Sequence, residues 1–178
     1  MTRCVALLRG VNVGRARRVA MADLRRLVEG IGCTEVRTLL NSGNVVFTAA
    51  SPDAAGHARA IQAALAAGCG FDVPVVALTA ADLAAVVRED PLAGVAVDPA
   101  RHLVAFVPDP AALNDLRRLL DEAWSPEALA VGRLTAYLWC AQGVADSRLA
   151  QACLRLGGDG VTTRNWTTVL KLLEAMTA

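Results

Sequence analysis

Short apolar runs alternate with amphipathic stretches along the whole chain. Cys4–Leu8 has the pattern of a buried strand that ends at Arg9-Gly10, and the loop Gly10–Val19 follows it. Apolar residues then recur at helical spacing and stop at Gly32, which is typical of a helix end; they are Met21, Leu24, Leu27, Val28 and Ile31. The chain is therefore predicted to begin with a strand, a long loop and a helix.

Two further strands and a helix complete the first half. Val36–Leu40 and Val45–Thr48 flank Asn41-Ser42-Gly43-Asn44, which is a predicted hairpin turn. Ala54–Ala67 is an alanine-rich helix, and Val73–Leu78 is the fourth strand. The order β-α-β-β-α-β is the split βαβ arrangement of ferredoxin-like domains.

The second half repeats this order less regularly. The predicted elements are a strand at His102–Val107, a helix at Ala111–Ala123, a hairpin of Ala128–Val131 and Leu134–Cys140, a helix at Ser147–Leu156, a strand at Val161–Thr163 and a final helix at Trp166–Met176. We therefore expect an α+β protein with two ferredoxin-like (alpha-beta plait, βαββαβ) domains in tandem. An N-terminal domain is expected over 1–79, a connecting helix and linker over 80–100, and a C-terminal domain with an extra C-terminal helix over 101–178.

Composition narrows the class of protein. Of the 178 residues, 54% are hydrophobic and 20% charged, which favours a globular chain over a disordered one. No apolar stretch reaches the roughly 20 residues that span a bilayer, and a strand pattern begins almost at once, which leaves no room for a signal peptide. The five cysteines show no C-x-x-C spacing, so we expect free thiols, mostly buried. These features predict a cytoplasmic protein with no membrane partner.

Charge is unevenly distributed along the chain, and the excess of arginines near the N-terminus makes the loop after the first strand a candidate anion site. Residues 1–40 carry eight arginines and three acids, a net of +5, whereas residues 50–130 carry five arginines and eleven acids, a net of −6. Gly10 and Gly14 allow unusual backbone conformations in this loop, and a helix follows it. Guanidinium groups near a helix N-terminus suit a phosphate or carboxylate. The candidate ligand-binding residues here are Arg9, Asn12, Arg15, Arg17 and Arg18, and the alternative is a structural turn with solvated arginines.

Two other segments offer candidate ligand-binding residues. Ser42 and Asn44 lie in the hairpin turn, which we expect at the opposite end of the sheet from the loop after the first strand. Arg164, Asn165 and Trp166 open the last helix, where the arginine and amide could reach a ligand and the indole could stack on a ring. In the alternative interpretation, Asn165 or Thr163 caps that helix, Trp166 anchors it by packing, and Arg164 pairs with a carboxylate.

Catalytic and metal-binding patterns are weak in this sequence. Two histidines leave little for a histidine metal site, no Cys/His set has zinc spacing, and we predict no cofactor and no metal. No G-x-S-x-G nucleophile elbow occurs, and the adjacent Glu89 and Asp90 are expected to be solvated at a helix end. Whether the protein is an enzyme stays open. The sequence favours a binding module for a nucleotide or nucleic acid; the alternatives are an enzyme acting on a small phosphorylated or carboxylated metabolite, and a protein-interaction factor.

Four segments resemble the bacterial family DUF1697, in the same order along the chain. They are Leu7-Leu8-Arg9-Gly10-Val11-Asn12-Val13-Gly14, Met21-Ala22-Asp23-Leu24, Ser42-Gly43-Asn44-Val45-Val46-Phe47, and Thr163-Arg164-Asn165-Trp166-Thr167-Thr168-Val169-Leu170-Lys171. The resemblance implies a tandem pair of ferredoxin-like domains. It implies no particular activity.

Overall fold

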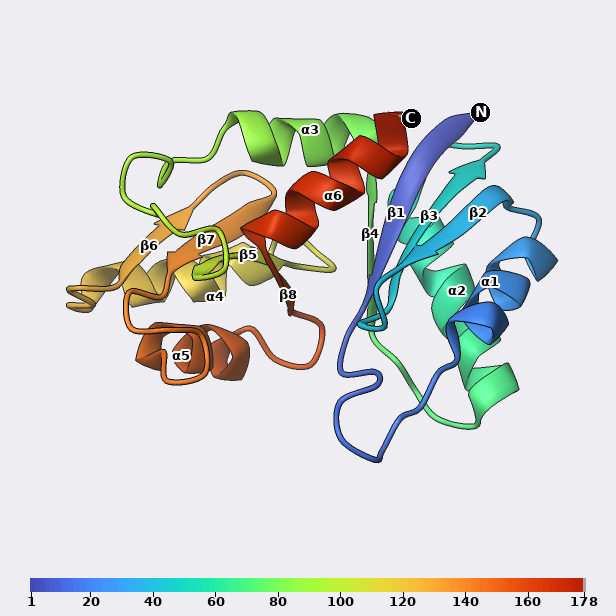
Figure 1. Ribbon diagram of the computed structural model, residues 1–178, viewed down its shortest axis with the longest axis horizontal. Coiled ribbons are helices and arrows are strands. Elements are labelled where there is room, and N and C mark those ends of the chain that lie inside the picture. The colour runs from blue at the N-terminus through green and yellow to red at the C-terminus, as the bar shows by residue number, and fades with distance from the viewer. Residues whose placement is uncertain (178) are drawn as a thin grey trace. The chain divides into compact units, whose positions relative to one another are not determined.

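The computed structural model describes residues 1–177 and confirms a mixed α+β protein (Figure 1). Within these residues the chain forms two four-stranded antiparallel sheets and six α-helices. It divides into a first unit, residues 1–83 together with the end of the last helix from Leu172, and a second unit, residues 84–171. The domain limits expected at 79/80 and 100/101 stay predictions.

The sheet of the first unit has the strand order β2-β3-β1-β4. In chain order, the elements of the first unit are β1 Thr2–Leu8, α1 Met21–Gly30, β2 Thr34–Leu39, β3 Asn44–Ala49, α2 Ala54–Cys69 and β4 Val75–Thr79. Helix α3 Ala80–Arg88 follows β4 directly. In Figure 1, α1 and α2 lie on the same face of this sheet. The predicted element order of the first half is confirmed.

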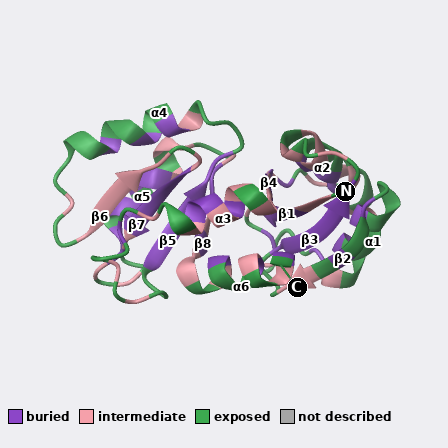
Figure 2. Cartoon of the chain, turned by 90° about the horizontal axis from the view of Figure 1, so that it is seen from above, coloured by how far each residue is buried: buried purple, intermediate pink, exposed green. Residues whose placement is uncertain are grey.

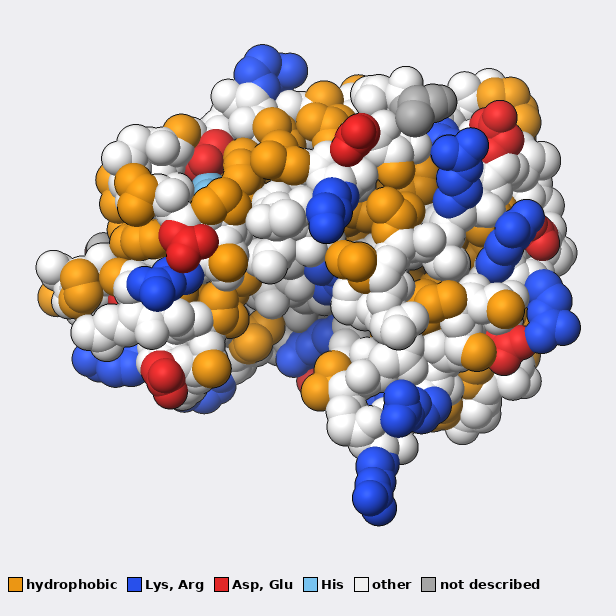
Figure 3. Space-filling view, viewed as in Figure 1, with side chains coloured by type: hydrophobic (Ala, Val, Ile, Leu, Met, Phe, Trp, Pro, Cys, Tyr) orange, Lys and Arg blue, Asp and Glu red, His pale blue; other side chains and the backbone are white. Residues whose placement is uncertain are grey.

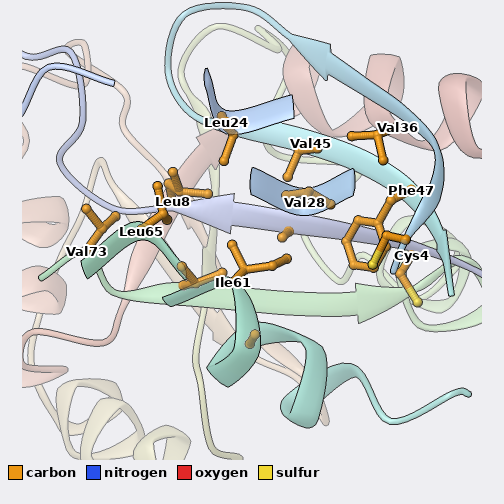
Figure 4. Packing of buried hydrophobic residues seen from close by; sticks show 14 of the residues in the cluster. Cys4, Leu8, Leu24, Val28, Val36, Val45, Phe47, Ile61, Leu65 and Val73 are labelled. Carbon is orange, nitrogen blue, oxygen red and sulfur yellow. The ribbon is translucent and has the colours of Figure 1, made fainter. Parts of the chain in front are cut away.

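Alternate strand residues of the first sheet point into one core beneath α1 and α2 (Figure 4). The buried strand residues shown there include Cys4, Leu8, Val36, Val45 and Phe47, and the helices contribute Leu24, Val28, Ile61 and Leu65. Burying each such side chain contributes about 1.5–3 kcal/mol. Strand side chains point alternately to the two faces of the sheet, so this core takes every second residue of β1 and β3, whose remaining residues are mostly buried on the other face.

The hairpin turn lies at the same end of the sheet as the loop after β1, so the expectation of opposite ends is wrong. Strand β3 runs antiparallel to β1, with Leu7 paired with Asn44. Because of that direction β3 begins where β1 ends. The turn between β2 and β3 therefore meets the loop that leaves β1.

The second unit repeats the strand arrangement with the order β6-β7-β5-β8. Its elements are β5 His102–Phe106, α4 Ala112–Arg117, a short 3-10 turn η1 Arg118–Asp121, β6 Ala128–Val131, β7 Thr135–Trp139, α5 Arg148–Leu156, β8 Thr162–Asn165 and α6 Trp166–Thr177. The core of this unit packs residues such as Leu103 and Leu138 against Leu116 and Leu149 of the helices. Figure 2 shows β5 and β7 largely buried, β6 of intermediate burial, and the outer side of α4 exposed.

The helix predicted over Ala111–Ala123 is shorter in the structure. Regular α-helix ends at Arg117, and the chain tightens into η1 and leaves it at Glu122, whose backbone is extended. The indole Nε1 of Trp124 donates to the carbonyl of Leu119 at 2.7 Å. The same carbonyl accepts from the amide of Glu122 at 3.2 Å, so it is satisfied at the point where the helical turns end.

Candidate functional site

Asn12 organises the loop between β1 and α1. Its Nδ2 donates to the carbonyls of Val19 at 2.9 Å and Asn41 at 2.7 Å, and its Oδ1 accepts from the amide of Val19 at 3.0 Å. The Asn12 backbone is left-handed, with φ 57°, which asparagine tolerates better than most residues. One side chain therefore closes the loop on itself and ties it to the hairpin turn.

Gly43 provides the second link between loop and turn. Its carbonyl accepts from the amide of Leu8 at 2.8 Å, and its φ is +78°. A Cβ at this position would lie 2.6 Å from Cγ2 of Val11 and 2.7 Å from Cβ of Leu8. Only glycine fits this contact, because the conformation and the space both exclude a side chain.

A pocket opens where loop, turn and helix meet. It has a volume of about 360 Å³ and is lined by Asn12, Arg18, Val19, Ala20, Met21 and Asn41. Ala20 is the N-cap of α1 and supplies no side-chain acceptor to the first helical N–H groups. The positive end of the α1 dipole is therefore open at the wall of this loop pocket.

Three exposed arginines of the loop, one of which lines the pocket, have no acidic partner among the described residues. Arg15, Arg17 and Arg18 are exposed, and none forms an ion pair or side-chain hydrogen bond with a residue of the described range 1–177. By contrast, Arg25 and Arg26 of the following helix α1 pair with Glu29 and Asp23. Figure 3 shows Lys and Arg side chains projecting into solvent in the region where Figure 1 draws the loop after β1. The exposure of Arg15, Arg17 and Arg18 is what the sequence interpretation expects of solvated side chains.

The turn residues of the candidate site have structural contacts. Asn44 is fully buried, and its Nδ2 donates to the carbonyl of Leu39 at 2.9 Å and to Oγ of Ser42 at 3.0 Å. Ser42 is exposed beside it. Arg9 is half-buried, and its backbone amide bonds to the carbonyl of Pro74 at 2.9 Å. These contacts hold the base of the turn and of the loop against the sheet.

The candidate residues of the last helix belong to the second unit. Arg164 is 8% exposed and donates to Oγ1 of Thr162 at 2.9 Å and the carbonyl of Thr163 at 2.8 Å, and burial lowers its pKa to about 10. Oδ1 of Asn165 caps α6 by accepting from the amide of Thr168 at 2.9 Å. These contacts agree with the structural alternative for Asn165.

The structure contains a buried pair, His102 and Asp90, that the sequence interpretation did not predict. The imidazole of His102 stacks on Trp166 with centroids 4.6 Å apart, and its Nε2 lies 3.6 Å from Oδ1 of Asp90. The two side chains are only 2% and 5% exposed, so the expectation that Asp90 is solvated is wrong, whereas Glu89 is exposed and pairs with Arg88. Burial lowers the pKa of His102, and the charge of Asp90 opposes that effect.

Other chemistry-bearing groups offer little within the described range. The five cysteines are free and four are buried; burial raises the pKa of Cys4 to about 11 and of Cys153 to about 12, which keeps those thiols protonated. No cluster of three His, Cys, Asp or Glu side chains in residues 1–177 could hold a metal ion. Nor does any helix in that range have the length and apolar character needed to cross a membrane.

One family model and one solved structure are similar to this chain. The family model described as a protein of unknown function (DUF1697) matches residues 1–137. The structure of conserved bacterial protein SP0830 from Streptococcus pneumoniae is similar, with 24% sequence identity, a TM-score of 0.81 and 98% of each chain covered. At that identity the likeness concerns the fold alone. No curated protein matches the chain.

Proposed function

Because the chain belongs to DUF1697, a family described only as proteins of unknown function, we propose its function from the geometry of the first unit. The loop pocket binds a phosphate group of a nucleotide or a nucleic acid. The observation that carries this proposal is the open N-terminus of α1 in a pocket that Arg18 lines, beside two further arginines that have no acidic partner in the described residues.

An anion in the loop pocket would gain several interactions at once. The backbone N–H groups and dipole at the start of α1 favour negative charge, and guanidinium groups give charge-assisted hydrogen bonds to phosphate oxygens. The side-chain amide of Asn12 is already engaged three times, so it fixes the shape of the pocket. Arg15, Arg17 and Arg18 are exposed and available to the ligand.

The ferredoxin-like class of each half is part of this proposal. It is supported by the order β2-β3-β1-β4 in the first unit, by β6-β7-β5-β8 in the second, and by the β-α-β-β-α-β succession of elements. Such sheets carry many unrelated functions, so the fold by itself does not select the ligand. The argument for phosphate therefore rests on the loop pocket.

Binding of a labelled single-stranded oligonucleotide and of ADP tests the proposal, at about 50 mM and about 150 mM salt. The variant Arg15→Ala/Arg17→Ala/Arg18→Ala should bind at least about tenfold more weakly, with a smaller salt dependence, because it loses phosphate contacts. A matched control, Arg25→Ala/Arg26→Ala/Arg37→Ala, removes three charges from exposed positions of the same unit and should bind like wild type.

The two probes separate the two ligand classes. Tight binding of the oligonucleotide with weak binding of ADP supports a nucleic acid, and the reverse supports a nucleotide. Equal affinity and equal salt dependence in wild type and loop variant would overturn the proposal. Thermal melts of all three proteins are run alongside, and the melts should nearly coincide because the substituted side chains are exposed.

A further inference from the structure

A second arginine-lined groove lies in the second unit, between η1 and α5. Its volume is about 520 Å³, and it is lined by Arg118, Leu119, Glu122, Trp124, Arg148, Gln151, Ala152, Arg155 and Leu156. We call it the arginine groove. It shares no residue with the loop pocket, and none of its side chains was a candidate in the sequence.

Helix α5 places three polar side chains along one wall of the groove. Arg148, Gln151 and Arg155 follow one another at spacings of three and four residues, so they lie on one face, with the arginine Cα atoms about 10 Å apart. Leu149 and Cys153 are buried in the core on the other side of the helix. The same helix therefore packs with one face and presents a basic face to the groove.

The start of α5 is capped by the protein itself. Oγ of Ser147 accepts from the amide of Ala150 at 2.9 Å, and Oε2 of Glu127 accepts from the amide of Leu149 at 3.1 Å. The helix end is therefore satisfied. Any attraction for an anion in this groove comes from the guanidinium groups.

Those guanidinium groups have no acidic partner in the described part of the chain. Arg118, Arg148 and Arg155 are exposed and form no ion pair or side-chain hydrogen bond with residues 1–177. Arg117, next to Arg118 in sequence, differs, because it donates to Oδ1 of Asn114 at 2.8 Å. Glu122 is the acidic residue among the lining residues, so the groove carries a net charge of +2. Like charges gathered around one hollow favour an anion of more than one charge.

Trp124 gives the groove a fixed aromatic wall. Its Nε1 bond to the carbonyl of Leu119 and its partial burial against the core hold the indole in place. A held ring can stack on the planar base of a ligand at little cost in side-chain entropy. A volume of about 520 Å³ falls within the range of small-molecule sites.

We propose that the arginine groove binds a nucleoside diphosphate or triphosphate. The phosphates contact Arg118, Arg148 and Arg155, and the base stacks on Trp124. Gln151 lies between the two arginines of α5 and offers a donor and an acceptor to the sugar. This site goes beyond the proposed function, because it is in the other unit and would act even if the loop pocket bound nothing.

Calorimetric titration with ADP, pyrophosphate and adenosine tests the proposal. ADP should bind most tightly, pyrophosphate more weakly and adenosine weakest. Arg148→Ala/Arg155→Ala should lower ADP affinity at least about tenfold, because two charge-assisted contacts are lost. The control Arg117→Ala/Arg133→Ala removes the same charge from exposed positions outside the groove and should bind like wild type.

Tryptophan fluorescence locates the base. ADP should quench the emission, and Trp124→Phe should remove most of that quenching while melts show a folded protein. Undiminished quenching in Trp124→Phe, or adenosine binding as tightly as ADP, overturns the proposal. A third result would also overturn it: the loop variant Arg15→Ala/Arg17→Ala/Arg18→Ala loses ADP binding while Arg148→Ala/Arg155→Ala keeps the wild-type affinity. That result would place the nucleotide in the loop pocket.

Discussion

The side-chain amide of Asn12 donates to the backbone carbonyl of Asn41 at 2.7 Å, across 29 residues of sequence. This bond joins the loop after β1 to the turn between β2 and β3. Both segments line the loop pocket, so the bond determines the shape of the proposed anion site. The side chain of Asn12 therefore contributes both to the stability of the first unit and to the shape of the loop pocket.

Replacing Asn12 should destabilise the protein. Asn12→Ala removes three hydrogen bonds, each of which contributes about 1 kcal/mol net, so we expect the free energy of unfolding to fall by about 2–3 kcal/mol. Asn12→Gly should lose about 1 kcal/mol less, because glycine relieves the left-handed backbone. Urea unfolding measures both.

Asn41→Ala is the matched control for that experiment. Asn41 contributes its backbone carbonyl to the bond, and the substitution keeps that carbonyl. We expect a change within about 0.5 kcal/mol. If Asn12→Ala were as stable as Asn41→Ala, the link between loop and turn would not contribute to folding.

Two glycines with similar backbone conformations should respond differently to alanine. Gly43 has φ +78° and no room for a Cβ, whereas Gly14 has φ +65° and nothing within 4 Å of the added atom. Gly14→Ala should cost about 1 kcal/mol, from conformation alone. Gly43→Ala should cost about 2 kcal/mol more, because Val11 and Leu8 must move within a packed core. Equal melting temperatures for the two variants would contradict the packing argument.

The order of elements could be predicted from sequence because it depends on local periodicity. The continuous apolar run Cys4–Leu8 indicates a strand buried on both faces, and the helical spacing of apolar residues in 21–31 indicates a helix with one buried face. The relation between loop and turn was predicted wrongly, although the antiparallel pairing of β1 with β3 was implicit in the predicted domain. The direction of one strand relative to another is enough to place Asn12 beside Asn41.

The features that escaped prediction depend on contacts between distant segments. The sequence predicts Asp90 at the end of a helix before Pro91. Nothing nearby in sequence indicates that its Oδ1 lies 3.6 Å from Nε2 of His102. Arg118 and Arg148 are 30 residues apart and belong to elements that look like ordinary amphipathic helices. A motif such as the Gly10–Arg18 loop can be recognised from sequence because its residues are consecutive.

The segment between α3 and β5 should be the first site of limited proteolysis. Residues 91–101 form no helix or strand, and Val95 and Val97 are 50% and 80% exposed. Elastase cleaves after small aliphatic residues, so brief digestion should yield fragments that end near these valines. This outcome supports the connecting helix and linker predicted over residues 80–100, with the linker at its end. First cuts within residues 36–48, which belong mostly to β2 and β3, would contradict it.

Stability should fall in mildly acidic solution because of His102. Burial lowers its pKa below the usual 6.5, so below pH 6.5 the unfolded chain takes up a proton more readily than the folded protein. The contribution of His102 is therefore complete above about pH 6.5 and is lost as the pH falls, by at most about 1.4 kcal/mol per pH unit. Urea unfolding at about pH 7.5 and about pH 5.5 measures the difference in stability. His102→Gln should reduce that difference, because glutamine does not titrate. If the difference were larger in His102→Gln than in wild type, the charge of Asp90 would outweigh burial and the imidazole would be held protonated beside it.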